Sequence, residues 1–112
     1  MKIPHAEQAL VERKKINEYL LNRKHPDNGA KADFYFQLGF SAEEWITFAA
    51  ALRLLAITCD VTTIVESKHG TKYIVDGDLE NPRRKRARVR TVWIIEVRGT
   101  IPRLVTSYPY EE

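Results

Sequence analysis

Residues 87–98, Ala-Arg-Val-Arg-Thr-Val-Trp-Ile-Ile-Glu-Val-Arg, are the stretch that decides the fold. β-Branched and aromatic side chains dominate it, which is typical of a β-strand with a buried face. Before it, alternating patterns predict a hairpin of residues 61–66 and 71–79 around His69-Gly70, and residues 101–108 are predicted as a last strand after Gly99. Consecutive strands joined by short turns pair as an antiparallel meander.

The first half of the chain has the spacing of helices instead. Apolar residues recur at i, i+3 and i+4 in residues 12–22 and again in about residues 29–38, with the turn-forming residues 25–29 between them. A third helix is predicted from Ser41, which opens a capping box with Glu44, to about Thr58. The sequence therefore predicts one α+β domain over residues 1–112, with N-terminal helices packed on one face of a four-stranded antiparallel sheet. The other face is left for a ligand.

Composition limits the classes of function. The 112 residues carry a net charge of +3, and no apolar run approaches the roughly 20 residues of a membrane-spanning helix. The N-terminus has no hydrophobic signal core, so a cytoplasmic protein is expected. Cys59 is the only cysteine, which excludes a disulfide framework and a Cys-rich zinc site, and it is expected to be a plain buried thiol. No nucleotide-binding or zinc-protease motif occurs, so neither a cofactor nor a metal is predicted.

A cluster of basic residues is the plainest indication of nucleic-acid binding. It opens after Asn81-Pro82 and focuses positive potential that could bind phosphates. A solvated hairpin tip, or a surface for an acidic protein partner, would have the same composition. The cluster consists of Arg83, Arg84, Lys85, Arg86, Arg88 and Arg90.

Lys31 and His25 are the candidates for chemistry in the first half. Lys31 lies at the end of the apolar stripe of the second predicted helix, where its stem could simply cover apolar surface. His25 lies in a turn, where most histidines are only solvated, yet histidine is the usual general acid or base near neutral pH. Two cationic groups near the start of a helix suit a phosphate.

The two last strands supply further candidates. Thr91 and Trp93 point to the same side of their strand, and Arg103 and Thr106 lie on the next one. A threonine with an arginine can bind a phosphate, and a tryptophan can stack on a base. The alternative is that Thr91 and Trp93 are core residues, because both residue types favour strands.

Five stretches of the chain carry a family resemblance. They are Tyr-Leu-Leu-Asn (19–22), His-Pro…Gly-Ala-Lys-Ala (25–32), Gly-Thr-Lys-Tyr-Ile-Val-Asp-Gly (70–77), Arg-Thr-Val-Trp-Ile-Ile (90–95) and Pro-Arg-Leu-Val-Thr-Ser-Tyr-Pro (102–109). In them the chain resembles a family of small uncharacterised bacterial domains. Such domains occur as stand-alone proteins, often beside a small partner gene, and similar ones occur at the C-termini of polymorphic toxins. The loop at residues 83–86 departs from the family pattern, which usually has a Gly-containing turn there.

The layout of helices followed by a four-stranded sheet also resembles the barnase, colicin and RelE group of metal-independent ribonucleases. This resemblance implies a toxin that cleaves RNA by attack of the 2′-hydroxyl, with a small cognate antitoxin protein as partner. The alternative is a non-enzymatic RNA- or protein-binding module of the antitoxin or immunity type. The implied site residues are His25, Lys31, Thr91, Trp93, Arg103 and Thr106.

Overall fold

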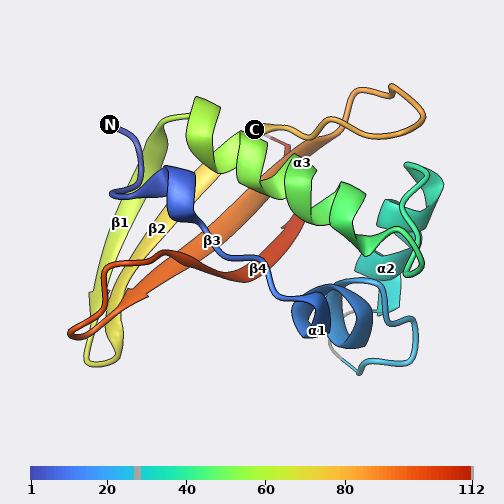
Figure 1. The fold of residues 1–112 in the computed structure, drawn as a ribbon. Helices are drawn as coiled ribbons and strands as arrows, with labels where there is room; N and C mark the ends of the chain where they lie inside the picture. The colour runs from blue at the N-terminus through green and yellow to red at the C-terminus, as the bar shows by residue number, and fades with distance from the viewer. Residues whose placement is uncertain (27–28, 112) are drawn as a thin grey trace.

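A four-stranded antiparallel sheet with strand order β1-β2-β3-β4 forms the centre of the protein (Figure 1). The computed structural model describes residues 1–26 and 29–111. The strands are β1 (Val61–Ser67), β2 (Gly70–Asp78), β3 (Arg88–Glu96) and β4 (Arg103–Pro109). The predicted strands and their meander order are therefore confirmed, with β3 inside the stretch 87–98.

The helices differ from prediction mainly at their boundaries. The helix predicted over 12–22 is an α-helical turn, α1 (Arg13–Lys15), that widens into a π-helix, η2 (Ile16–Leu20). The third helix, α3 (Trp45–Thr58), begins later than predicted, although the Ser41 hydroxyl accepts the expected hydrogen bond from the backbone N–H of Glu44 at 3.2 Å. The second helix is α2 (Gly29–Gln37), and a short 3-10 turn, η1 (Ala6–Gln8), precedes them all. Residues 27 and 28 of the predicted turn lie outside the described residues.

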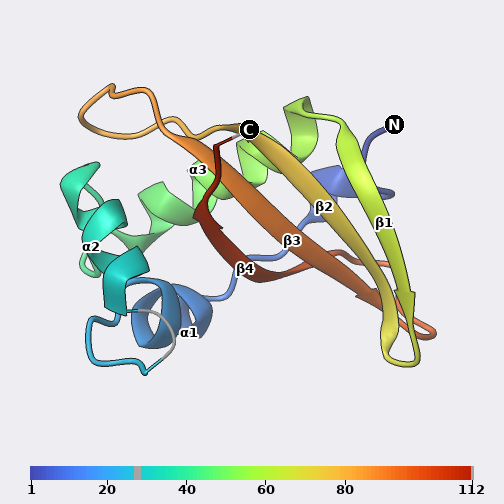
Figure 2. The same ribbon diagram turned by 180° about the vertical axis from the view of Figure 1, so that it is seen from behind.

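α3 lies across one face of the sheet (Figure 1), and seen from behind the strands lie in front of it (Figure 2). The contact is close, because a Cβ on Gly77 of β2 would lie only 2.8 Å from the Cys59 sulfur at the end of α3. Large side chains fill the space between the layers, among them the fully buried Trp93, Phe48 and Leu52. The predicted arrangement of helices over one face of the sheet is confirmed.

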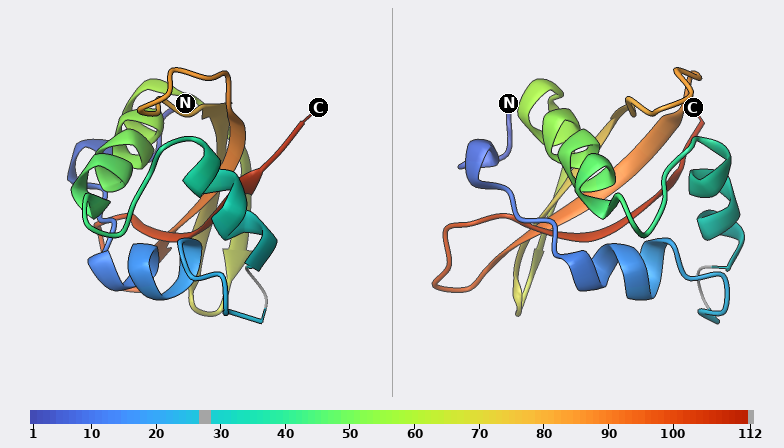
Figure 3. Two further views of the ribbon diagram at one scale, coloured as in Figure 1. Left: turned by 90° about the vertical axis from the view of Figure 1, so that its right-hand side faces the viewer. Right: turned by 45° about the vertical axis from the view of Figure 1, so that its right-hand side comes forward.

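α1, η2 and α2 gather at the β4 side of the sheet (Figure 3). The chain reaches them through an N-terminal segment that pairs with β4, since Leu10 forms a parallel bridge with Arg103. The Leu10 N–H donates to the Pro102 carbonyl at 2.8 Å, and the Leu104 N–H donates to the Leu10 carbonyl at 3.0 Å. This segment thereby fixes the start of η2 beside β4. No helix in the described part of the chain has the length and apolar character needed to cross a membrane.

Candidate functional site

Lys31, Tyr19 and Thr106 meet at the β4 edge of the sheet. The Lys31 ammonium lies 3.1 Å from the Tyr19 hydroxyl oxygen and 3.5 Å from the Thr106 hydroxyl oxygen. The two hydroxyl oxygens are 3.0 Å apart and share a hydrogen bond. All three side chains are only partly buried, so the cluster is open to a ligand. Residues from η2, α2 and β4 that are far apart in the sequence are thus brought together.

Tyr19 is the centre of this cluster. The π-helical turn, closed by a hydrogen bond from the Leu21 N–H to the Ile16 carbonyl at 2.8 Å, carries it toward β4. Its ring is contacted edge-on by His25, with ring centroids 4.9 Å apart. The Lys31 ammonium lies 5.2 Å from the centre of the same ring. π-Helical turns often occur at functional sites, and here one sets the position of a hydroxyl group.

An open cleft of about 450 Å³ adjoins the cluster. It contains two of the predicted residues, His25 and Arg103, whereas Thr106 and Lys31 reach Tyr19 at its edge. Arg103 also forms an ion pair with Glu96. Cationic side chains around a hydroxyl pair form a setting that suits an anionic ligand such as a phosphate. The cleft is lined by Glu12, Lys14, Lys15, Glu18, Tyr19, His25 and Arg103.

The environment lowers the pKa of Tyr19 below the ordinary value of a tyrosine. Partial burial alone would raise this pKa, but hydrogen bonds with Thr106 and Lys31, and the positive charges of Lys31 and Lys15, outweigh it. These contacts stabilise the phenolate, relative to the phenol, more than water does for a solvated tyrosine. Tyr19 is therefore a group that can release a proton more readily than a solvated tyrosine does.

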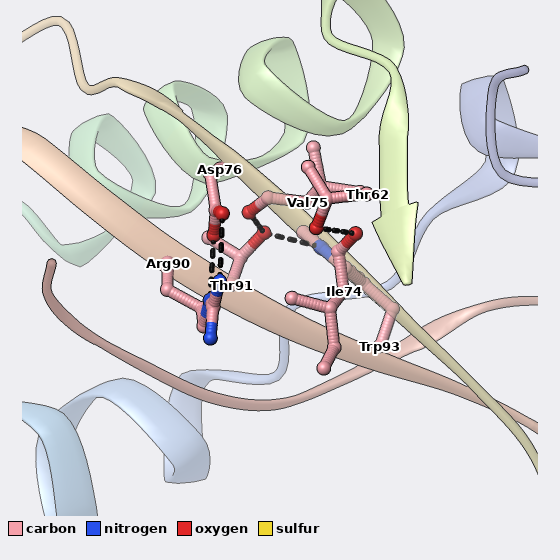
Figure 4. A network of polar contacts seen from close by, with 7 residues as sticks. All are labelled: Thr62, Ile74, Val75, Asp76, Arg90, Thr91 and Trp93. Carbon is pink, nitrogen blue, oxygen red and sulfur yellow. Dashed lines mark hydrogen bonds and ion pairs between the residues drawn. The ribbon is translucent and has the colours of Figure 1, made fainter. Parts of the chain in front are cut away.

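The structure corrects the prediction that Thr91 and Trp93 face a ligand, because both side chains are 0% exposed. They lie on the side of β3 that α3 covers, where the Trp93 indole N–H donates to the Thr91 hydroxyl at 2.8 Å (Figure 4). The Thr91 hydroxyl donates in turn to the Val75 carbonyl at 2.8 Å. Thr106 pairs with Val92 and therefore points to the opposite side of the sheet. The two residues thus form a satisfied core network.

Arg90 is likewise engaged within the fold. Its guanidinium donates to both carboxylate oxygens of Asp76, at 2.8 and 2.9 Å (Figure 4), and stacks on the Tyr110 ring at 3.7 Å. The hydrogen bond and the charge of Asp76 hold the pKa of Arg90 above its usual range. Asp76 thus compensates the charge of Arg90 within the fold, and contact of Arg90 with phosphate stays a prediction. The Asp76 carboxylate, in turn, is occupied by its ion pair with Arg90.

The other predicted basic residues remain accessible. Residues 83–86 are exposed in the loop between β2 and β3, and Arg88 is half-buried on β3. The Asn81 side chain organises this loop, because its amide donates to the carbonyls of Leu79 and Lys85 and its oxygen accepts from the Lys85 N–H. The Arg83 N–H donates to the Leu38 carbonyl after α2 at 3.3 Å. The exposed cations therefore lie on a loop that Asn81 orders from within and that is hydrogen-bonded to the residue after α2.

Sequence reasoning missed Tyr19, because its ring fits the apolar stripe of the predicted first helix. The signal that could have found it is its terminal hydroxyl, which needs a partner wherever the ring is packed. Of the predicted residues, His25, Lys31, Arg103 and Thr106 lie around it. Across residues 1–26 and 29–111, no three histidine, cysteine or carboxylate side chains gather in a way that could hold a metal ion.

The fold is similar to that of a solved structure titled "Contact-dependent growth inhibition toxin - immunity protein complex from Klebsiella pneumoniae 342", with a TM-score of 0.73. The sequences are 14% identical, and the match covers 96% of this chain and 97% of the other. No curated protein matches the chain. The family model described as "Domain of unknown function (DUF6883)" matches residues 2–111, and the chain belongs to this family.

Proposed function

We propose that the chain is a metal-independent ribonuclease, the toxin of a bacterial toxin–antitoxin or related conflict system. The observation that carries this proposal is the convergence of Lys31, His25 and Arg103 with the hydroxyls of Tyr19 and Thr106 at one cleft. These are the residue types that phosphoryl transfer requires when no metal takes part: cations, hydroxyls and an imidazole.

RNA supplies its own nucleophile for such a reaction, the 2′-hydroxyl beside each phosphate. The protein then needs groups that move protons and groups that compensate the charge developing on the phosphorane. His25 is suited to proton transfer, and Lys31 and Arg103 are suited to charge compensation. Thr106 is suited to hold a phosphate oxygen. Thr91 cannot do so, because it is fully buried.

The exposed loop residues Arg83, Arg84, Lys85 and Arg86, with Arg88 beside them, support an RNA substrate. They lie at the C-terminal end of α2, whose N-terminal turn carries Lys31. In an α-helix the seven residue steps from 31 to 38 span about 10 Å, so one RNA strand is long enough to contact both regions. Counterion release from the strand would add affinity without sequence specificity.

The shared fold with a growth-inhibition toxin–immunity complex supports a place in a toxin system. On this proposal the partner is a small cognate antitoxin protein, and the site of action is the cytoplasm, where RNA is found. An antitoxin would act most directly by covering the cleft beside Tyr19.

The test is incubation of the purified chain with RNA in EDTA, with gel electrophoresis of the products. The proposal expects cleavage of transfer, messenger or ribosomal RNA with 2′,3′-cyclic phosphate ends, at the same rate with and without the chelator. Intact RNA after prolonged incubation with folded protein would refute the ribonuclease assignment. Cleavage that EDTA abolishes would refute the metal-independent part alone.

The complex with the similar fold also contains an immunity protein, which favours a second candidate: a non-enzymatic binding module of the immunity or antitoxin type. Such a module would use the basic loop and would not need the Tyr19 cluster. Induced expression in a bacterial host separates the two. The ribonuclease is expected to arrest growth, and Lys31→Ala is expected to abolish the arrest, whereas the module would leave growth normal.

A further inference from the structure

The two proton-transfer groups of the cleft can be told apart by their surroundings. We infer that Tyr19 is the general acid that protonates the leaving 5′-oxygen of the RNA and that His25 is the general base. This assignment rests on the proposed ribonuclease function and adds to it a catalytic residue and a direction for each proton.

The geometry around the Tyr19 hydroxyl supports the role of acid. The Lys31 ammonium donates to the hydroxyl oxygen at 3.1 Å, so that a positive charge stands where negative charge forms when the proton leaves. Thr106, 3.0 Å away, supplies a second polar contact and can donate to a phenolate. Tyr19 is only partly buried and lines the cleft, so a substrate can approach this side chain.

His25 makes a T-shaped contact with the same ring, with ring centroids 4.9 Å apart, and also lines the cleft. The order of the roles follows from the contacts of the two groups. The Lys31 ammonium lies at the Tyr19 hydroxyl, where it can stabilise the charge left when that proton is given up. Histidine is the side chain that most often accepts a proton in general base catalysis, so the role of base falls to His25.

The positive charges around Tyr19 make its proton easier to release, while Tyr19 still carries that proton before the reaction. Lys31 reaches it from α2 and Lys15 from α1, the latter with its ammonium 5.2 Å from the ring centre. Arg103 adds a cation from β4, and Glu12 and Glu18 of the cleft wall oppose them. Tyr108 of β4 contacts the same Lys31 through its ring. The hydrogen bonds and cations lower the pKa of Tyr19, which makes it a stronger acid.

The proposed cleavage moves two protons. The 2′-oxygen forms a bond to phosphorus while its proton moves to the His25 imidazole. The bond between phosphorus and the 5′-oxygen breaks, and that oxygen takes the proton of the Tyr19 hydroxyl. The products are a 2′,3′-cyclic phosphate, a 5′-hydroxyl, a His25 imidazolium and a Tyr19 phenolate next to Lys31. Water returns the proton from imidazolium to phenolate.

The test compares two substrates whose leaving groups differ in basicity. One is the dinucleotide uridylyl-adenosine, whose 5′-alkoxide must be protonated, and the other is uridine 3′-(4-nitrophenyl phosphate), whose nitrophenolate leaves without a proton. Tyr19→Phe is expected to cleave the dinucleotide about 100-fold or more slowly than wild type and the nitrophenyl ester within about tenfold of it. His25→Ala is expected to lose activity on both substrates, because both need the base.

Two further variants control the comparison. Tyr73→Phe changes a tyrosine of β2 that packs against the core, and it should cleave both substrates like wild type. Thr106→Val keeps the Tyr19 proton but removes one hydrogen bond that stabilises the phenolate, and it should slow the dinucleotide more than the nitrophenyl ester. Melting temperatures show whether each variant is folded at the assay temperature.

Equal losses of Tyr19→Phe on the two substrates, or full activity on the dinucleotide, would overturn the assignment while the ribonuclease function stands. A wild-type protein that cleaves neither the dinucleotide nor any longer RNA would instead refute the proposed function itself.

Discussion

Replacing Lys31 with alanine is the sharpest perturbation of the candidate site. The ammonium donates one good hydrogen bond, to the Tyr19 hydroxyl at 3.1 Å, and a longer one to Thr106 at 3.5 Å. It also lies 5.2 and 5.5 Å from the ring centres of Tyr19 and Tyr108. For a half-buried group these contacts together stabilise the fold by about 1 to 2 kcal/mol. The melting temperature should therefore fall by roughly 4 to 8 °C, which leaves the protein folded.

The loss of activity should be larger than the loss of stability. Removal of one group that stabilises transition-state charge lowers the rate about 100- to 1,000-fold, which corresponds to about 2.7 to 4 kcal/mol. The assay is single-turnover cleavage of a fluorogenic RNA, with affinity measured separately on a 2′-O-methyl analogue that cannot react. Affinity should change far less than rate.

Lys15→Ala is the matched control. Its ammonium lies 5.2 Å from the same Tyr19 ring, as that of Lys31 does, but only Lys31 contacts the hydroxyl and Thr106. The control should lose less than about tenfold in rate. Equal rate losses for the two variants, or a Lys31→Ala protein with wild-type activity per folded molecule, would show that Lys31 only covers apolar surface.

Lys31→Ala should also shift the titration of Tyr19. Lys31 lowers the pKa of Tyr19 by its hydrogen bond and its charge, so the phenolate should form at higher pH in Lys31→Ala. Ultraviolet absorbance of the phenolate, with Tyr19→Phe as the blank, measures this shift. Because the pKa is lowered in the folded state, the linked stability appears only near and above pH 10 and is absent at pH 7. The stability loss at pH 7 must then come from the contacts themselves.

Other regions allow separate tests. Tyr35→Phe should cost about 1 to 3 kcal/mol in urea unfolding, because it leaves the buried Ser107 hydroxyl, 2.6 Å from that of Tyr35, without its partner; the double variant with Ser107→Ala should recover most of this, and no recovery would contradict the pairing. Gly70→Ala should destabilise by about 3 kcal/mol or more in thermal unfolding, since φ is 143° and the new Cβ would overlap the Ile95 carbonyl oxygen; a wild-type melting temperature would refute this contact. Serine at all four positions 83–86 should flatten the salt dependence of RNA affinity by roughly one unit of slope per lost phosphate contact, and an unchanged slope would show that the loop does not contact phosphate.

The strands could be predicted because their signals are local. β3 is crowded with β-branched and aromatic residues, and turn residues separate it from its neighbours. The π-helical turn of η2 could not be predicted in this way, because an apolar stripe fits α- and π-helical turns alike over so short a distance. Ile16 and Leu20 of this turn are both fully buried, a pattern that an α-helix would show as well.

The candidate site, too, could be predicted only where the signals are local in sequence. Alternation along a strand shows that Thr91 and Trp93 share a side, but which side α3 covers depends on contacts between distant residues, such as that of Cys59 with Gly77. His25 and Lys31 could be selected by residue type and by their places in a turn and near a helix start. Their meeting with Thr106 depends on tertiary structure, so Tyr19, the residue that connects them, remained hidden in an apolar pattern.

The hydrogen bond between Tyr19 and Thr106 joins residues 87 positions apart, which has a consequence for the order of folding. Contacts between such distant residues close late, because the loop between them must first be ordered. When a ribosome has made the chain only as far as β3, Tyr19, His25 and Lys31 have been synthesised. Arg103 and Thr106, which belong to β4, have not. Under the proposed ribonuclease function, this delay leaves the nascent chain without a complete site while its own messenger RNA is still being read.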